Sequence, residues 1–161
     1  MENATAAPIA VALYQPDIPA NLGATARMCA CFGLPLHVIE PAGFPWSHKA
    51  LKRAGMDYLD HVRIIRHDSW QAFLKAMGDR RLILASTRAA FPHHAFFYAP
   101  GDILLFGREC CGVPQEVHDA AHARVRIPLR PGLRSLNVAM SAGIIAAEAL
   151  RQLSAFPEES R

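Results

Sequence analysis

Short apolar runs alternate with longer amphipathic segments along almost the whole chain. The short runs are rich in Val, Ile and Leu, which is typical of buried strands. They predict strands over residues 9–14, 36–40, 61–65, 81–87, 102–106 and 124–129. The longer segments predict helices over residues 19–32, 47–54, 69–77 and 136–153, with a short helix after Pro114.

This regular alternation predicts the fold class. Strands separated by helices form mostly parallel sheets that helices cover on both faces. A chain of 161 residues, 52% of them hydrophobic, is long enough for one domain with a complete core. We therefore predict a single α/β domain over residues 1–161, with its core from about residue 9 to residue 153. The first seven residues and the tail after Phe156 are expected to be loose.

Neither a membrane partner nor a bound metal is predicted. No apolar run approaches the roughly 18 residues that a membrane-spanning helix needs. The first residues, MENATAAP, lack the basic and apolar regions of a signal peptide, so a cytoplasmic location is expected. The spacing of Cys29, Cys31, Cys110 and Cys111 gives no C-x-x-C pair and no zinc quartet, and we expect buried free thiols.

The basic residues are unusual in kind rather than in number. The net charge is only +3, but 14 of the 17 basic residues are Arg, whose planar guanidinium suits phosphate contacts and stacking on bases. One basic cluster comprises Lys49, Lys52 and Arg53, and a second lies within residues 124–134 and holds no acid. Such clusters are either solvated faces or contacts for a nucleic acid, and charge alone leaves both open.

Three loops that follow predicted strands carry glycines and polar residues. They read PANLGATAR (19–27), FGRECCGVP (106–114) and IPLRPGLRSLN (127–137). Open α/β sheets bind ligands at the carboxyl ends of their strands, where these loops are expected. The chain contains no G-x-G-x-x-G or G-x-x-x-x-G-K-[ST] motif, so nothing supports a dinucleotide or nucleoside triphosphate enzyme.

Taken singly, each loop also has a purely structural interpretation. In the first loop, Asn21 would cap a helix and Gly23 would allow close packing. In the second, Gly112 and Pro114 would turn the chain into a helix. In the third, a strand ends and a helix begins, which is ordinary in α/β proteins.

Taken together, the loops form three ordered motifs. These are N-x-G-x-x-x-R (Asn21, Gly23 and Arg27), F-G-x-E-x-x-G-x-P (106–114) and I-P-x5-R-S-L-N (127–137). In this order they resemble the SPOUT superfamily of RNA methyltransferases. Within it, the chain resembles the small single-domain methyltransferases of the tRNA wobble nucleotide, through QPDIPANLGATARMCACFGLPLHVIEP (15–41) and FPWSHKALKRAGMDY (44–58). The tandem cysteines, and Val113 where Leu is common, differ from the usual second motif but replace none of its polar groups.

The resemblance implies a C-terminal deep trefoil knot that binds S-adenosylmethionine as methyl donor. An adenine needs apolar walls and a few backbone hydrogen bonds, which strand ends supply. Gly107 would let the backbone approach the donor closely, because it has no Cβ. Plain core packing is the alternative for the side chains of Ile127 and Leu136. The donor-binding residues implied are Ala85, Thr87, Gly107, Ile127, Ser135 and Leu136.

By the same resemblance, Arg27 is the main catalytic residue. Because a guanidinium has a pKa above about 12, we expect Arg27 to clamp a phosphate and stabilise a developing alkoxide rather than act as the base. A solvated or helix-capping role is the alternative for Glu109. The residues expected to orient Arg27 and the ribose are Asn21, Glu109, Ser135 and Asn137.

The implied partners are tRNA and a second copy of the chain. Phosphate contacts are expected from Lys49, Lys52, Arg53, Arg130 and Arg134. A homodimer is expected because the family places its active site near a subunit interface. Small residues along the last helix suit such an interface, although burial inside the monomer gives the same pattern; they are Ala139, Ala142, Gly143, Ala146 and Ala147.

The activity implied is methyl transfer to the ribose 2′-hydroxyl of the wobble nucleotide, cytidine 34 or modified uridine 34, in tRNA anticodon loops. An enzyme acting at another tRNA or ribosomal RNA site would share the motifs, but such relatives often carry an added RNA-binding domain, for which this chain has no room. A non-catalytic RNA-binding module is the other alternative, and the intact third motif argues against it.

Overall fold

The structure is a computed structural model that describes residues 6–53 and 57–160. Within that part of the chain, seven strands form one sheet, and every pair of neighbouring strands is parallel. The strands are β1 (Ala10–Tyr14), β2 (Leu36–Ile39), β3 (Ile64–His67), β4 (Leu82–Ala85), β5 (Phe91–Pro92), β6 (Ile103–Phe106) and β7 (Ala123–Arg126).

The helices connect these strands and begin and end where the local sequence favours it. Helix α1 begins at Pro19, a residue preferred in the first turn, and ends before Gly33, whose φ of 68° suits glycine. The hydroxyl of Ser69 caps α3 by accepting from the Ala72 amide. The described helices are α1 (Pro19–Phe32), α2 (His48–Arg53), η1 (Leu59–His61), α3 (Trp70–Met77), η2 (His93–Ala95), α4 (Gln115–Ala120) and α5 (Val138–Leu153).

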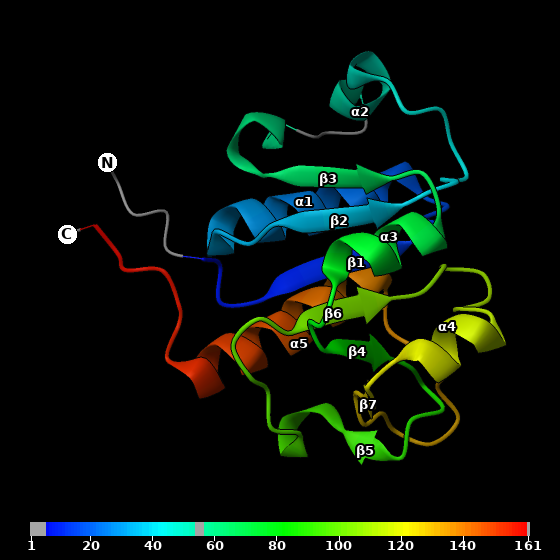
Figure 1. Ribbon diagram of the computed structural model, residues 1–161, viewed down its shortest axis with the longest axis vertical. Coiled ribbons are helices and arrows are strands. Elements are labelled where there is room, and N and C mark those ends of the chain that lie inside the picture. The colour runs from blue at the N-terminus through cyan, green and yellow to red at the C-terminus, as the bar shows by residue number, and fades with distance from the viewer. Residues whose placement is uncertain (1–5, 54–56, 161) are drawn as a thin grey trace.

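The strand order across the sheet is β3-β2-β1-β6-β4-β7-β5 (Figure 1). The chain therefore returns late to place β6 in the middle of the sheet, between β1 and β4. Because all strands run in the same direction, the loops that leave β1, β6, β4 and β7 meet at one edge of the sheet. The three motif loops are among them.

Helices cover both faces of the sheet. Val11 and Leu13 of β1 belong to an apolar cluster with α1 and α5, whereas Ala10 and Ala12 belong to a second cluster with α3 and α4. Figure 1 shows α1 and α5 behind the sheet and α3 and α4 in front of it. Alternate strand residues point to opposite faces, so both faces of β1 must be apolar, as its sequence is. This confirms the predicted α/β fold class.

The predicted strands are all present, with shifted ends. The strand predicted over 61–65 lies at Ile64–His67, because His61 ends the short helix η1. The strand predicted over 124–129 ends at Arg126, before the proline at 128. The two-residue edge strand β5 was not predicted, because two residues carry no periodicity.

The helix predictions are confirmed with small corrections. The helix predicted over 136–153 begins at Val138, and Asn137 is its cap. The helix predicted over 47–54 is described as His48–Arg53, and residue 54 lies outside the described residues. Part of the predicted loose ends, residues 1–5 and 161, also lies outside them.

The cysteine prediction holds for Cys29 alone. Cys29 is buried and free, and burial raises the pKa of its thiol to about 12. Cys31 is free but exposed, because it lies two residues further along α1 and points to the other side. Cys110 and Cys111 are exposed and bonded to each other, so the prediction of buried free thiols is wrong for this pair. They lie in a turn rather than in the core.

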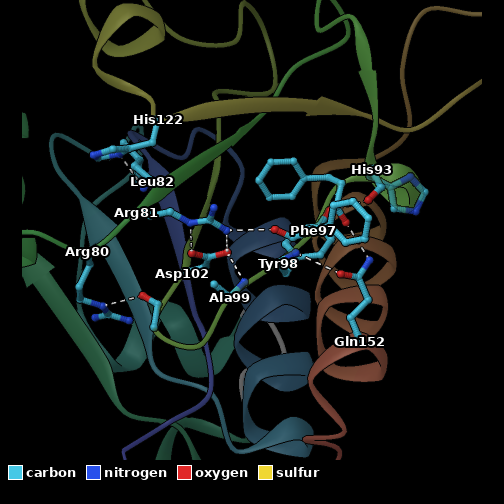
Figure 2. A network of polar contacts seen from close by, with 12 residues as sticks. Arg80, Arg81, Leu82, His93, Phe97, Tyr98, Ala99, Asp102, His122 and Gln152 are labelled. Carbon is cyan, nitrogen blue, oxygen red and sulfur yellow. Dashed lines mark hydrogen bonds and ion pairs between the residues drawn. The ribbon is translucent and has the colours of Figure 1, made fainter.

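A polar network stabilises the amino ends of β4 and β6 (Figure 2). Arg81 precedes β4 and donates two hydrogen bonds, of 2.8 and 2.7 Å, to the carboxylate of Asp102, which precedes β6 and is 1% exposed. The same carboxylate accepts from the Ala99 amide, and Gln152 of α5 accepts from the Tyr98 amide. This network closes the end of the sheet opposite the motif loops.

Candidate active site

A cavity of about 740 Å³ lies at the carboxyl ends of β4, β6 and β7 and beside the amino ends of α1 and α5. All three motif loops line it. A cavity of this size suits a cofactor-sized molecule. The three loops that the sequence offers as separate candidates therefore build one site.

The cavity collects every residue predicted to bind the methyl donor. Some of these residues follow strands and others precede α5, so separate segments between Ala85 and Leu136 contribute to the same cavity. Because predicted residues from several separate segments line the same cavity, the arrangement favours their binding one common ligand. The predicted residues that line the cavity are Ala85, Thr87, Gly107, Ile127, Ser135 and Leu136.

The walls combine apolar side chains with strand-end backbone. Phe106, Val125 and Ile145 line the cavity from the buried core. Ile127 lines it and also packs against the core, so its side chain has a packing role, and a role in binding the donor stays a prediction. Leu136 is half-buried at the cavity. Apolar side chains beside strand-end backbone match what an adenine ring requires.

Two glycines shape the turn of the second motif. The Arg108 and Gly112 backbones bond to each other in both directions at 2.9 Å, which closes a tight turn over residues 108–112. A Cβ added at Gly107 would lie 2.7 Å from the Gly112 carbonyl carbon, too close for any side chain. The sequence predicts that Gly107 is needed so that the backbone can approach the donor. In the structure, the close contact with Gly112 already requires a residue without Cβ at this position.

Glu109 joins the second motif to the first. Its carboxylate accepts from the Asp17 amide at 2.9 Å and from the Asn21 side-chain nitrogen at 3.2 Å. Asn21 Oδ1 in turn accepts from Asn137 Nδ2 at 2.8 Å. One hydrogen-bonded chain therefore connects all three motifs.

These contacts decide two alternatives left open by the sequence. Glu109 is half-buried with two donors, so it is neither a solvated acid nor a helix cap. Asn21 does not cap α1, because the cap position is Ile18 and the Asn21 side chain points to Glu109 and Asn137. The capping asparagine is Asn137, whose Oδ1 accepts from two amides of the first turn of α5.

A second connection between the same loops was not predicted from the sequence. Asp17 accepts from the guanidinium of Arg108 at 2.8 and 3.3 Å, and this hydrogen bonding raises the pKa of Arg108. Gln15, directly after β1, has a φ of +44°, a conformation that side chains rarely adopt. Gln15 and Asp17 both follow β1, a buried strand that ends at the ligand-binding edge of the sheet. That position was the signal in the sequence for a role at the site.

Arg27 lies outside the cavity. It is exposed on α1, and its guanidinium carbon is 4.8 Å from the centre of the Tyr58 ring. Asn21, from the same motif, does line the cavity. The structure thus brings together four of the five predicted catalytic residues, Asn21, Glu109, Ser135 and Asn137, but does not place Arg27 with them.

The predicted RNA-binding residues occupy two separate places. Lys49, Lys52 and Arg53 are exposed on α2, beyond the β3 edge of the sheet (Figure 1). Arg130 and Arg134 are exposed on the loop after β7, and Arg134 lines the cavity mouth. Two separated basic surfaces suit a ligand larger than the cavity.

A family model decides what kind of protein has this site: the SpoU rRNA Methylase family matches residues 8–147. The chain belongs to the SpoU rRNA methylase family. This confirms the resemblance inferred from the motifs. S-adenosylmethionine is bound in a solved structure of a similar rRNA methyltransferase, and the cavity, which apolar side chains, polar side chains and strand-end backbone line together, fits such a donor. The trefoil knot stays a prediction that family membership implies.

Curated relatives within this methylase family match over nearly their whole length. A tRNA (cytidine(34)-2′-O)-methyltransferase of Beijerinckia indica is 55% identical, covering 90% of this chain and 92% of the relative. The enzyme of the same name from Escherichia coli K12 is 42% identical, covering 89% and 92%.

Solved structures within the family agree in fold. A structure described as giving insights into the 2-OH methylation of C/U34 on tRNA has a TM-score of 0.86 and 44% identity, covering 91% of this chain and 96% of that one. An AdoMet-bound rRNA methyltransferase from Sinorhizobium meliloti has a TM-score of 0.81 and 26% identity, covering 91% of this chain and 59% of that one.

Two further features bear on possible partners. Among residues 6–53 and 57–160, no helix has the length and apolar character needed to cross a membrane. Over the same residues, no group of three or more His, Cys, Asp and Glu side chains gathers as metal ligands would.

Proposed function

We propose that this protein transfers a methyl group from S-adenosylmethionine to the ribose 2′-hydroxyl of the wobble nucleotide, cytidine 34 or modified uridine 34, in tRNA anticodon loops. The observation that carries the proposal is the single cavity built by all three motif loops. Relatives that carry this activity in their names, and align over about nine-tenths of the chain, support the choice of substrate.

The donor occupies the cavity between β4, β6, β7 and α5. The apolar walls would hold its adenine, and the strand-end backbone around Ala85, Gly107 and Ile127 would supply hydrogen bonds to it. Ser135 and Leu136 close the cavity from the third motif, and Thr87 from the loop after β4. The sulfonium of the donor supplies an electrophilic methyl group for in-line displacement by an oxygen.

The protein's own task is to align that oxygen and help remove its proton. Positioning alone can supply much of the rate. The connected side chains of Asn21, Glu109 and Asn137 form a fixed frame beside the cavity, and Ser135 faces the reacting end. Arg27 clamps a phosphate next to the ribose and stabilises the developing alkoxide.

The anticodon loop is the part of tRNA that suits this surface. Its bases are unstacked and reachable, whereas the deep, narrow groove of an RNA helix excludes side chains. Lys49, Lys52, Arg53, Arg130 and Arg134 contact phosphates on either side of the target. Recognition through the sugar and backbone does not demand one base, which agrees with both cytidine and uridine as substrates.

We include a homodimer in the proposal. Ala142 and Ala146 are buried inside the monomer where α5 packs with α1, so these two of the five small residues do not supply the interface. Ala139, Gly143 and Ala147 are half-buried. Met140 and Ile144, one turn apart on α5, are instead 59% and 37% exposed. In the proposed dimer, Arg27, which lies outside its own cavity, serves the site of the other copy.

We further propose that the protein works in the cytoplasm as one methyltransferase domain. The experiment that tests the function in its setting compares tRNA from cells with and without the gene. Ribose methylation at position 34 is expected to disappear from the cells without it and to return with the gene. Loss at another position instead would favour a methyltransferase with a different RNA target.

A further inference from the structure

Arg27 differs from the arginines whose guanidinium pairs with a carboxylate. Two of those, Arg66 and Arg81, also lie over an aromatic ring, 4.4 and 5.3 Å from its centre. Arg66, Arg81, Arg108 and Arg151 each form an ion pair with a carboxylate. Arg27 has no such pair among the described residues, and its guanidinium lies over the face of Tyr58, 4.8 Å from the ring centre.

Tyr58 is itself fixed to the protein. It directly precedes η1, and its carbonyl accepts from the His61 amide at 2.9 Å. Its ring is half-buried and meets the edge of the His61 ring at 6.2 Å. Leu59, the next residue, packs against the core cluster that contains α1. The ring is thus a fixed surface beside a long, exposed and otherwise flexible side chain.

An aromatic face and a carboxylate hold a guanidinium in different ways. A carboxylate occupies the N–H groups and neutralises the charge. A ring face attracts the cation while the N–H groups, which lie in the guanidinium plane, stay free. An arginine that must donate to a phosphate or a ribose oxygen needs the second arrangement.

We propose that Tyr58 is a positioning residue for methyl transfer: its ring holds the Arg27 guanidinium in the reactive orientation with its donors free. This inference rests on the proposed role of Arg27. The ring itself touches neither donor nor ribose, and its hydroxyl takes no part.

The test is steady-state methylation of tRNA by four enzymes: wild type, Tyr58→Leu, Tyr58→Phe and Phe96→Leu. Removing the ring is expected to lower kcat about three- to tenfold, the worth of one cation–π contact. The KM for tRNA and the affinity for S-adenosylmethionine should stay within about twofold of wild type. Tyr58→Phe keeps the ring and should restore kcat. Phe96→Leu is the matched control, because Phe96 lies 5.3 Å below Arg81 at the far end of the sheet and its loss should leave kcat unchanged.

Two further enzymes, Arg27→Ala and the double variant Arg27→Ala with Tyr58→Leu, show how Tyr58 acts. Measured at high enzyme concentration, the double variant should be no slower than Arg27→Ala alone, since the ring then has nothing to hold. A full additional loss would mean that Tyr58 contacts the RNA directly, and the inference would be wrong. A wild-type kcat in Tyr58→Leu would also show that the inference is wrong. The same holds if the kcat of Tyr58→Phe stays as low as that of Tyr58→Leu. If Arg27→Ala itself were fully active, the proposed role of Arg27 would be the part that fails.

Discussion

Glu109 shows at the scale of single residues how the site is held. Its two carboxylate oxygens each accept one hydrogen bond, from the Asp17 amide and from the Asn21 side chain. Hydrogen bonds to a charged group are worth more than neutral ones, about 1.5–3 kcal/mol. The motif pattern predicted Glu109 and Asn21 as site residues. It did not predict Asp17 as the partner of Glu109, because a backbone amide donor is not tied to a residue type; only the position of Asp17 after a buried strand indicated a role at this edge.

The first prediction concerns Arg27. Arg27→Ala is expected to lower methylation at least a hundredfold while leaving the affinity for S-adenosylmethionine close to wild type, since Arg27 lies outside the cavity. Arg27→Lys should fail as well, because lysine lacks the planar fork of donors. Methyl transfer to tRNA and calorimetric donor binding measure the two effects. Arg63→Ala, another exposed arginine, is the control and should be near wild type. Normal turnover in the Arg27→Ala enzyme would reject the assignment.

At the scale of elements, α5 serves both stability and the site through Asn137. Its Oδ1 caps the helix, and its Nδ2 donates to Asn21. The periodicity of the sequence predicted this helix well, but its first residue was missed by two positions, because Leu136 continues the apolar pattern into the loop. The strand predicted over 124–129 was too long for the same reason, because Ile127 and Leu129 continue the apolar pattern beyond Arg126. The strand predicted over 61–65 begins later because His61 ends η1. Pattern identifies an element, whereas caps and turns define its ends.

Asn137 allows these two roles to be separated. Asn137→Asp keeps an oxygen that caps α5 but loses the donor to Asn21, so it should unfold like wild type yet methylate about tenfold more slowly. Asn137→Ala loses both the cap of α5 and the donor to Asn21. It should therefore methylate slowly and also have a free energy of unfolding about 1 kcal/mol below that of wild type. Urea unfolding and methylation assays distinguish them. Equal activity of Asn137→Asp and wild type would show that the link between the first and third motifs is dispensable.

The strands β2 and β3 carry a pair of buried histidines, His37 and His67, which do not line the cavity. His37 and His67 stack with ring nitrogens 2.9 Å apart and pack on Phe73. Burial first, and then the neighbouring His67, lower the pKa of His37 to about 4, from an ordinary value of 6.5.

Because the folded pKa lies below the unfolded one, the unfolded chain binds more protons between these values. The free energy of unfolding should therefore fall by about 2 kcal/mol between pH 7 and pH 4.5 on account of this pair. Urea unfolding across that range measures it. His37→Phe should flatten the dependence, and His61→Gln, on an exposed histidine, should not. An equally steep fall in His37→Phe would place the effect elsewhere.

At the scale of the whole molecule, the strand order creates the site. The late return of β6 between β1 and β4 brings the ends of four strands, and with them all three motifs, to one edge (Figure 1). Alternation of strands and helices predicted a parallel sheet but not this strand order. The spacing of apolar residues depends on which side chains are buried, and it does not depend on which strands lie next to each other. The resemblance to known enzymes implied that the second and third motif loops share one donor site, but it implied no strand order. The Arg27–Tyr58 contact remained hidden, since the motifs name Arg27 without naming what holds it.

The central claim is methylation of the wobble ribose, and one measurement tests it most directly. The purified protein is incubated with isotope-labelled S-adenosylmethionine and purified tRNA that lacks the modification, and the product is mapped by nuclease digestion and mass spectrometry. We predict one methyl group, on the 2′-oxygen of nucleotide 34. A methyl group on a base, or on a ribose outside the anticodon loop, would contradict the account.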